Sequence, residues 1–236
     1  NYYNVIVFDE VSMMTDDIKK LIFNRYSNHK LILCGDINYQ LPTHIGTPID
    51  TKGFDVIRNH DINYRIKCDE LKNVCNLLRK EIKKGNDKNV IKTLTFRKRL
   101  NEKVKKFFTE KKRVITVEEL KKLYDIKDYI LVGTKAVGYE YTKLFTGKFK
   151  DQNGSLEEKY YVYSNDGKHS NGDIIYSSKK PNAKCEVRHH FTTHSIQGET
   201  IRPPLKIFID AKTMFESRMF YTAISRAVKL DQIYLI

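Results

Sequence analysis

The sequence predicts an α/β protein built on parallel β-sheet, with a small antiparallel β unit inserted toward its C-terminal end. Short, continuous apolar runs of the kind that form strands covered on both faces alternate with segments of helical periodicity. Between residues 151 and 188 the pattern changes to short alternating runs separated by turns that contain Asn and Gly. A chain of 236 residues is long enough for one core and a smaller appended or inserted unit.

The first part of the chain is predicted to form a strand, a helix and a second strand. Residues 5–8 and residues 31–34 are both uninterrupted apolar runs. Residues 15–26 have a helical pattern, with Thr15 at the position of the N-terminal cap. Because such a crossover joins parallel strands, we expect the carboxyl ends of both strands at the same edge of one sheet.

The remaining elements extend this α/β pattern and interrupt it once. Further helices are expected at residues 69–84, 101–108, 117–124, 135–145 and 215–227. Further strands of the parallel type are expected at residues 129–132, 188–193, 205–209 and 232–236. The inserted unit is expected to contain strands at residues 160–163 and 173–177 and turns at Asn165-Asp166-Gly167 and Asn171-Gly172.

The composition favours a polyanionic partner. Lys and Arg total 43 against 29 Asp and Glu, a formal net charge of +14, which favours nucleic acid through counterion release. The four cysteines form no CxxC pair, and no apolar run approaches the length of a membrane span. We therefore expect an intracellular protein without membrane contact, and the sequence leaves nuclear, cytoplasmic and viral replication compartments open.

An acidic pair follows the first predicted strand. In nucleotide hydrolases a first carboxylate at such a position organises Mg²⁺, and a second orients or deprotonates the attacking water. Asp9 and Glu10 fit that arrangement, although carboxylates end strands in many doubly wound sheets. The next strand ends in Gly35-Asp36, followed by Gln40, at the edge where open α/β sheets bind ligands. The two strand ends together favour a nucleotide site.

Five strings, in order, resemble motifs of superfamily 1 helicases of the RecD-like and Pif type. They are VIVFDEVSMM at 5–14 (motif II), GDINYQLP at 35–42 (motif III), Asn63-Tyr64-Arg65 (motif IV), FTTHSIQGET at 191–200 (motif V) and MFYTAISRAV at 219–228 (motif VI). The resemblance implies RecA-like parallel-sheet domains. Their expected bounds are 1–62 for the later part of the first domain, 63–150 with 189–236 for a complete second domain, and 151–188 for an inserted small β-barrel.

The same resemblance implies a role for each candidate residue. Asp9 would hold Mg²⁺, Glu10 would activate water, Gln40 would sense the γ-phosphate of ATP, and Arg65 and Arg226 would approach that phosphate from the second domain. Gln197 and Gly198 would join the nucleotide site to bound nucleic acid, and Thr193 and His194 would approach its backbone. Simpler roles stay open at this point, including a surface ion pair for Arg65 and a backbone turn for Gly198.

One expected feature of the family is missing from the sequence. No Gly-Lys-Ser or Gly-Lys-Thr string occurs, so the loop that would cradle the phosphates is expected upstream of Asn1. The resemblance therefore implies the C-terminal portion of an ATP-dependent DNA helicase, inactive alone, with single-stranded DNA and replication or repair proteins as partners. A non-catalytic nucleic-acid-binding or replication scaffold and a viral RNA helicase are the alternatives.

Two weaker patterns complete the set of candidates. Cys185, His189, His190 and His194 lie close enough in sequence to hold zinc, although adjacent strand residues point to opposite faces. Phe96, Tyr139 and Tyr141 are candidates for stacking on unpaired bases.

Overall fold

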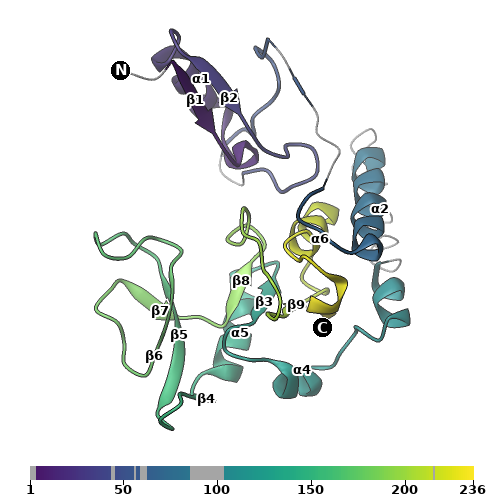
Figure 1. The fold of residues 1–236 in the computed structure, drawn as a ribbon, viewed down its shortest axis with the longest axis vertical. Helices are drawn as coiled ribbons and strands as arrows, with labels where there is room; N and C mark the ends of the chain where they lie inside the picture. The colour runs from purple at the N-terminus through teal and green to yellow at the C-terminus, as the bar shows by residue number, and fades with distance from the viewer. Residues whose placement is uncertain (1–3, 44–45, 56, 59–62, 86–103, 215) are drawn as a thin grey trace.

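The computed structural model describes residues 4–43, 46–55, 57–58, 63–85, 104–214 and 216–236. These residues form a two-stranded parallel sheet, a four-stranded parallel sheet and an antiparallel unit of four strands. Figure 1 shows the two-stranded sheet at the top, the larger parallel sheet with its helices below it, and the antiparallel unit at the lower left.

The N-terminal unit is the strand–helix–strand crossover that the sequence predicts. Strands β1 (Val5–Phe8) and β2 (Lys30–Leu33) are parallel, and α1 (Asp16–Arg25) lies between them in the chain. The Thr15 hydroxyl accepts a hydrogen bond of 3.2 Å from the backbone N–H of Ile18, so Thr15 caps the helix as expected.

The prediction that these two strands are covered on both faces is wrong for the described residues. Val5 is 45% exposed and Val7 is 60% exposed, and burial alternates along both strands. The face of this sheet that carries Val5 and Val7 is therefore only partly covered by the described residues.

The larger parallel sheet confirms the remaining strand predictions. Its strand order is β10 (Ile233–Leu235), β9 (Ile207–Ile209), β3 (Tyr129–Val132) and β8 (His190–Thr192), and every neighbouring pair is parallel. The helices around it are α2 (Asp69–Gly85), α4 (Val117–Leu123), α5 (Lys135–Phe145) and α6 (Ser217–Ile224). Residues 104–110 are also helical, and residues 101–103 of that predicted helix lie outside the described residues.

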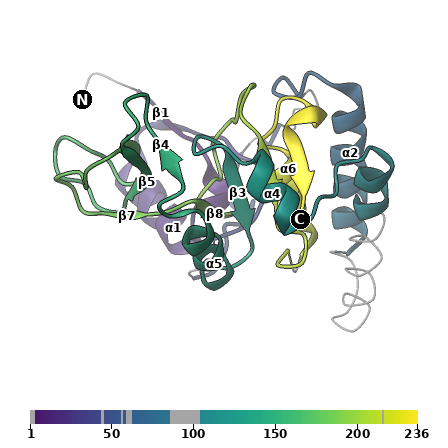
Figure 2. The same cartoon turned by 90° about the horizontal axis from the view of Figure 1, so that it is seen from below.

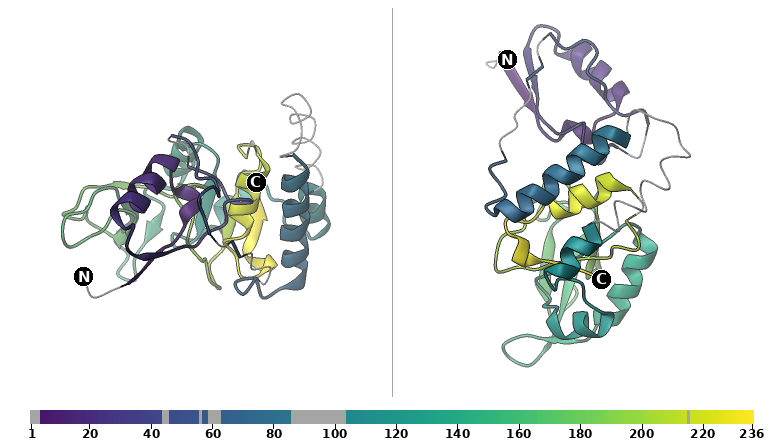
Figure 3. Two further views of the ribbon diagram at one scale, coloured as in Figure 1. Left: turned by 90° about the horizontal axis from the view of Figure 1, so that it is seen from above. Right: turned by 90° about the vertical axis from the view of Figure 1, so that its right-hand side faces the viewer.

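Helices cover both faces of this sheet. Leu131 packs in a cluster with apolar residues of α2 and α6, whereas Ile130 and Val132 pack in a second cluster with residues of α4 and α5. Figure 2 shows α4 and α5 beside β3, and the right panel of Figure 3 shows α2 and α6 side by side below the N-terminal unit. The part of the larger parallel-sheet unit that carries α2 and α6 therefore faces the N-terminal unit, which contains β1 and β2.

The inserted unit is antiparallel, as predicted, and is centred on one strand. Strands β4 (Phe149–Lys150), β6 (Ile174–Ser177) and β7 (Cys185–Val187) all pair with β5 (Leu156–Val162). Gly167 and Gly172 have φ values of 81° and 103°, which fits the turns predicted from Asn-Asp-Gly and Asn-Gly. Closure of these strands into a barrel stays a prediction.

A buried lysine joins the inserted unit to the larger parallel sheet. The Lys159 side chain on β5 is fully buried, and its Nζ donates a hydrogen bond of 2.6 Å to the carbonyl of Asp128. The same Nζ lies 4.9 Å from the ring centroid of Tyr129 and 5.1 Å from that of Phe191, which are cation–π distances. Burial lowers the pKa of Lys159 to about 7.

This pKa predicts how Lys159→Met changes the pH dependence of stability. From the folded pKa of about 7 up to the ordinary lysine pKa, the unfolded chain binds a proton that the folded chain lacks. The free energy of unfolding of the wild type should therefore rise relative to the variant, by up to about 1.4 kcal/mol per pH unit. Urea unfolding at several pH values tests this. Lys179→Met, at an exposed lysine of the same unit, serves as the control, and parallel curves for wild type and Lys159→Met would contradict the prediction.

The predicted stacking residues are only partly accessible. Tyr141 is buried, and its hydroxyl donates a hydrogen bond of 2.9 Å to Asp210, so its predicted role in base stacking is wrong. Tyr139 is 39% exposed and stays a candidate, and Phe96 lies outside the described residues. No helix in the described part of the chain is long and apolar enough to cross a membrane.

Candidate active site

The acidic pair lies directly after β1, on a turn of unusual backbone conformation. Glu10 has φ 52° and ψ 40°, a left-handed conformation that is uncommon for residues other than glycine, and its backbone N–H donates to Asp9 Oδ1 at 2.8 Å. Glu10 Oε2 is buried and has no hydrogen-bond partner among the described residues. A carboxylate oxygen in that state is available to a ligand or to water.

Gly198 brings the second parallel sheet against this carboxylate. A Cβ added at Gly198 would lie 3.6 Å from Glu10 Oε1, and the φ of Gly198 is 89°. The positive φ therefore favours glycine at 198, as the simpler interpretation of a backbone turn expects, and the residue also lies next to Glu10.

Gln197 of the motif V string contacts the motif II and motif III strings across the boundary between the two parallel sheets. Its Nε2 donates to Gln40 Oε1 at 3.0 Å, to Ser12 Oγ at 2.8 Å and to the carbonyl of Leu41 at 3.2 Å. Its Oε1 is buried without a partner among the described residues. Gln40 and Gln197, which the sequence names separately, are thus in direct contact.

Arg226 is a buried cation held by neutral oxygen atoms. Its side chain is fully buried after α6, where it donates to the carbonyl of Thr222 at 3.0 Å, the carbonyl of Glu199 at 3.2 Å and Ser225 Oγ at 3.0 Å. Burial lowers the pKa of Arg226 to about 10, the charge of Arg65 lowers it too, and Glu10 opposes the shift. The guanidinium therefore remains charged at neutral pH.

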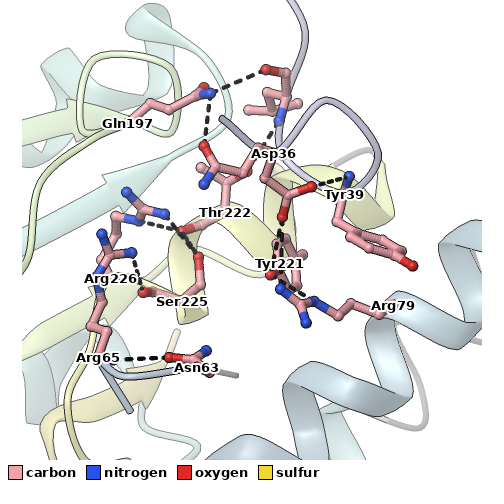
Figure 4. A network of polar contacts seen from close by, with 12 residues as sticks. Asp36, Tyr39, Asn63, Arg65, Arg79, Gln197, Tyr221, Thr222, Ser225 and Arg226 are labelled. Carbon is pink, nitrogen blue, oxygen red and sulfur yellow. Dashed lines mark hydrogen bonds and ion pairs between the residues drawn. The ribbon is translucent and has the colours of Figure 1, made fainter. Parts of the chain in front are cut away.

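Arg65 lies beside this buried cation. Its Nη1 donates to the carbonyl of Ser225 at 3.0 Å, so the chain segment before α2 contacts the end of α6 (Figure 4). Two guanidinium groups side by side repel each other, and an anion between them would relieve that repulsion. The structure brings together Arg65 and Arg226 as the sequence predicts.

The two residues predicted to approach the nucleic-acid backbone differ in accessibility. Thr193 is fully buried, its Oγ1 has no partner among the described residues, and its contact with nucleic acid stays a prediction. Its backbone N–H donates to the carbonyl of Val132 at 3.2 Å, which ties it to the end of β3. His194 is half-buried, and its role stays a prediction.

Some residues at this boundary carried no prediction from the sequence. Thr222 accepts a hydrogen bond of 3.3 Å from the backbone N–H of Leu41, and the hydroxyl of Tyr221 donates to Asp36 Oδ2 at 3.3 Å. Arg79 on α2 contacts both Tyr221 and Asp36. The motif VI string contains Tyr221 and Thr222 and could have signalled them, but nothing around Arg79 in the sequence indicates its partners.

The acidic pair fits a magnesium ion only when other oxygens complete the site. Asp9 is an exposed carboxylate at the end of β1, and carboxylates are ligands that Mg²⁺ prefers. The described residues contain no group of three or more His, Cys, Asp or Glu side chains that could hold a metal ion. Mg²⁺ usually takes one or two carboxylates together with phosphate oxygens and water, so Asp9 suits a Mg²⁺ that arrives with a nucleotide.

Because the described residues contain no such group of metal-binding side chains, the hypothesis of a zinc site has no support. His189 and His190 are both buried, and their Nδ1 atoms lie 3.1 Å from the hydroxyl of Tyr124 and 2.9 Å from that of Thr142. Burial lowers the pKa of His189 to about 3 and that of His190 to about 4, so both rings are neutral. They pack the larger parallel sheet rather than form a shared metal site.

The carboxylates of Asp9 and Glu10 follow β1 of the smaller parallel sheet, and the guanidiniums of Arg65 and Arg226 lie beside the larger one. The candidate ligand site of this α/β protein therefore lies at the boundary between the two sheets. Solved structures share this fold. Pif1 helicase from Candida albicans has a TM-score of 0.63 at 13% identity, covering 99% of this chain and 72% of that one. Bacteroides Pif1 bound to ssDNA has a TM-score of 0.61 at 14% identity, covering 98% of this chain and 70% of that one.

A third similar structure carries a nucleotide analogue. Pif1 helicase from Bacteroides in complex with ADP-AlF3 and ssDNA has a TM-score of 0.58 at 17% identity, covering 98% of this chain and 70% of that one. No family model matches the chain, and no curated protein matches it in sequence. The chain therefore has a Pif1-like helicase fold, which confirms the predicted α/β fold class with RecA-like parallel sheets.

Proposed function

We propose that the chain is the C-terminal portion of an ATP-dependent DNA helicase of superfamily 1, of the Pif type. The observation that carries this proposal is the contact of Gln197 Nε2 with Ser12, Gln40 and Leu41. One amide from the second sheet thereby reaches residues of motifs II and III at once. Such a contact suits an enzyme in which a nucleotide bound beside one parallel sheet changes the position of the other sheet.

Each candidate residue has a chemical role in this proposal. Glu10 accepts the proton of the attacking water through a carboxylate that is buried and unpartnered at Oε2. Arg65 and Arg226 face the charge that develops on the transferred phosphoryl group, and Gln40 senses the γ-phosphate. Asp9 would hold Mg²⁺, which neutralises phosphate charge when bound.

The proposed domains follow the sheets. Residues 1–62 belong to the first RecA-like domain, residues 63–150 with 189–236 form the second, and residues 151–188 are the inserted unit. ATP binding and hydrolysis would close and open the boundary between the domains, and single-stranded DNA would cross both. Polarity by family analogy is 5′ to 3′.

This chain alone is proposed to be inactive as an ATP hydrolase. The sequence contains no Gly-Lys-Ser or Gly-Lys-Thr string, and backbone N–H groups of such a loop are what cradle the phosphates. In the proposal that loop precedes residue 1 in the longer protein. Sequencing the encoding DNA upstream of Asn1 distinguishes the enzyme from a non-catalytic scaffold, which would lack the loop.

Single-stranded DNA is expected to stimulate ATP hydrolysis by the full-length protein at least about tenfold, because nucleic acid and nucleotide meet at the same boundary. The measurement is steady-state phosphate release with and without an oligodeoxynucleotide, followed by unwinding of a tailed duplex. An oligoribonucleotide of the same sequence is the matched comparison. Stronger stimulation by RNA would favour the RNA helicase alternative, and nucleic-acid binding without hydrolysis would favour the scaffold.

A further inference from the structure

Arg79 makes a second set of contacts across the boundary between the two sheets, separate from those of Gln197. It lies within α2, and 26% of its side chain is exposed. Its Nε donates a hydrogen bond of 2.9 Å to the hydroxyl of Tyr221 on α6, and its Nη2 lies 3.8 Å from Asp36 Oδ2. Arg79 therefore connects both helices to the strand end of motif III (Figure 4).

Two aromatic rings hold the same guanidinium from either side of the boundary. Arg79 Cζ lies 5.0 Å from the ring centroid of Tyr39, on the N-terminal unit, and 5.4 Å from that of Tyr221. Both distances are in the cation–π range, and the two rings are themselves 6.0 Å apart. The guanidinium thus contacts one aromatic residue of the N-terminal unit, Tyr39, and one of the unit that contains the larger parallel sheet, Tyr221.

Asp36 is the point at which these contacts meet. Its Oδ1 accepts a hydrogen bond of 2.9 Å from the backbone N–H of Tyr39, and its Oδ2 accepts one of 3.3 Å from the hydroxyl of Tyr221. Tyr39 directly precedes Gln40, the proposed γ-phosphate sensor. The loop that carries Gln40 is therefore fixed by Asp36, and Asp36 is bound from the second sheet by Tyr221 and Arg79.

We propose that Arg79 is a positioning residue that holds the closed arrangement of the two sheets by binding Asp36, Tyr39 and Tyr221 together. It touches none of the residues assigned to ATP, so it acts through the Asp36 loop rather than on the reacting atoms. In the closed arrangement Glu10 meets Gly198 and Gln40 meets Gln197. The consequence for hydrolysis rests on the proposed function, whereas the consequence for domain closure does not.

Arg79→Met in the full-length protein is expected to give a more open particle with a larger radius of gyration by small-angle X-ray scattering. In steady-state hydrolysis with saturating single-stranded DNA, its kcat should fall about tenfold while KM for ATP changes less than about twofold, as expected for loss of one hydrogen bond to a charged group. Lys80→Met, at the exposed neighbour on α2, is the matched control and should leave both readouts unchanged.

Tyr221→Phe is the second variant, because it removes only the hydroxyl that Arg79 and Asp36 share. It should open the particle like Arg79→Met, and the double variant should be no more open than either single variant. A wild-type scattering profile for both single variants overturns the proposal, whatever their hydrolysis rates. If the protein hydrolyses no ATP at all, the proposed function fails, and the scattering comparison still decides the role of Arg79.

Discussion

Arg226→Lys in the full-length protein is expected to lower kcat for ATP hydrolysis about a thousandfold, with a much smaller change in KM for ATP. The positive charge is kept, so the loss comes from geometry. A guanidinium has five N–H donors, and Arg226 uses three of them on Thr222, Glu199 and Ser225. Two donors remain for a phosphoryl oxygen, whereas a lysine ammonium cannot satisfy the same acceptors and reach a ligand.

The position of Arg226 explains why its effect should fall on the transition state. It bonds to the carbonyl of Glu199, next to Gly198, which lies against Glu10. The buried cation is therefore already placed and desolvated near the proposed base, so that it needs no reorganisation as charge develops. Arg202→Lys, at an exposed arginine of the same segment, is the control. Hydrolysis by Arg226→Lys within about tenfold of the wild-type rate would contradict the role of a finger.

The parallel-sheet fold could be predicted from local patterns because its strands are buried on both faces. In β3 the residues Ile130, Leu131 and Val132 are all fully buried, and a continuous apolar run is the signature of such a strand. The same signature misled for Val5 and Val7, since their burial depends on packing partners that the described residues do not provide. A run of apolar residues shows which side chains a strand could bury, but it does not show whether other elements cover them.

Several residues of the candidate site could be named from the sequence, but their contacts could not be predicted. Gln40 and Gln197 are 157 positions apart, and Arg79 and Tyr221 are 142 positions apart, so nothing local in one sequence pairs them. Motif strings identified Gln40 and Gln197 because their chemistry is tied to a resemblance. Arg79 has the appearance of one more polar residue on an amphipathic helix, and only tertiary structure assigns its partners.

Tyr141 shows the same limit for a single residue. Its position in a basic chain rich in aromatic residues favoured base stacking, yet its hydroxyl pairs with Asp210, 69 positions away. A tyrosine with a buried polar partner packs as core, and the sequence contains no local sign of that partner.

Glu10→Gln in the full-length protein is expected to lower kcat by about a hundredfold to ten-thousandfold, while ATP binding is retained. The amide has nearly the same shape as the carboxylate, so the contact with Gly198 is preserved, but it cannot accept the proton of the attacking water. Hydrolysis would be measured by phosphate release and binding by a fluorescent ATP analogue. Asp17→Asn, at an exposed carboxylate on α1 of the same unit, should leave both unchanged.

Combining Glu10→Gln with Arg226→Lys separates two explanations of a slow Glu10 variant. If Glu10 and Arg226 act on one phosphoryl transfer, the double variant should be far less impaired than the product of the two single losses, because residues of one catalytic unit are not additive. If Glu10→Gln merely disturbs the strained turn after β1, the losses should multiply. Full hydrolysis by Glu10→Gln would remove Glu10 as the base and would leave Asp9 as the carboxylate to test next.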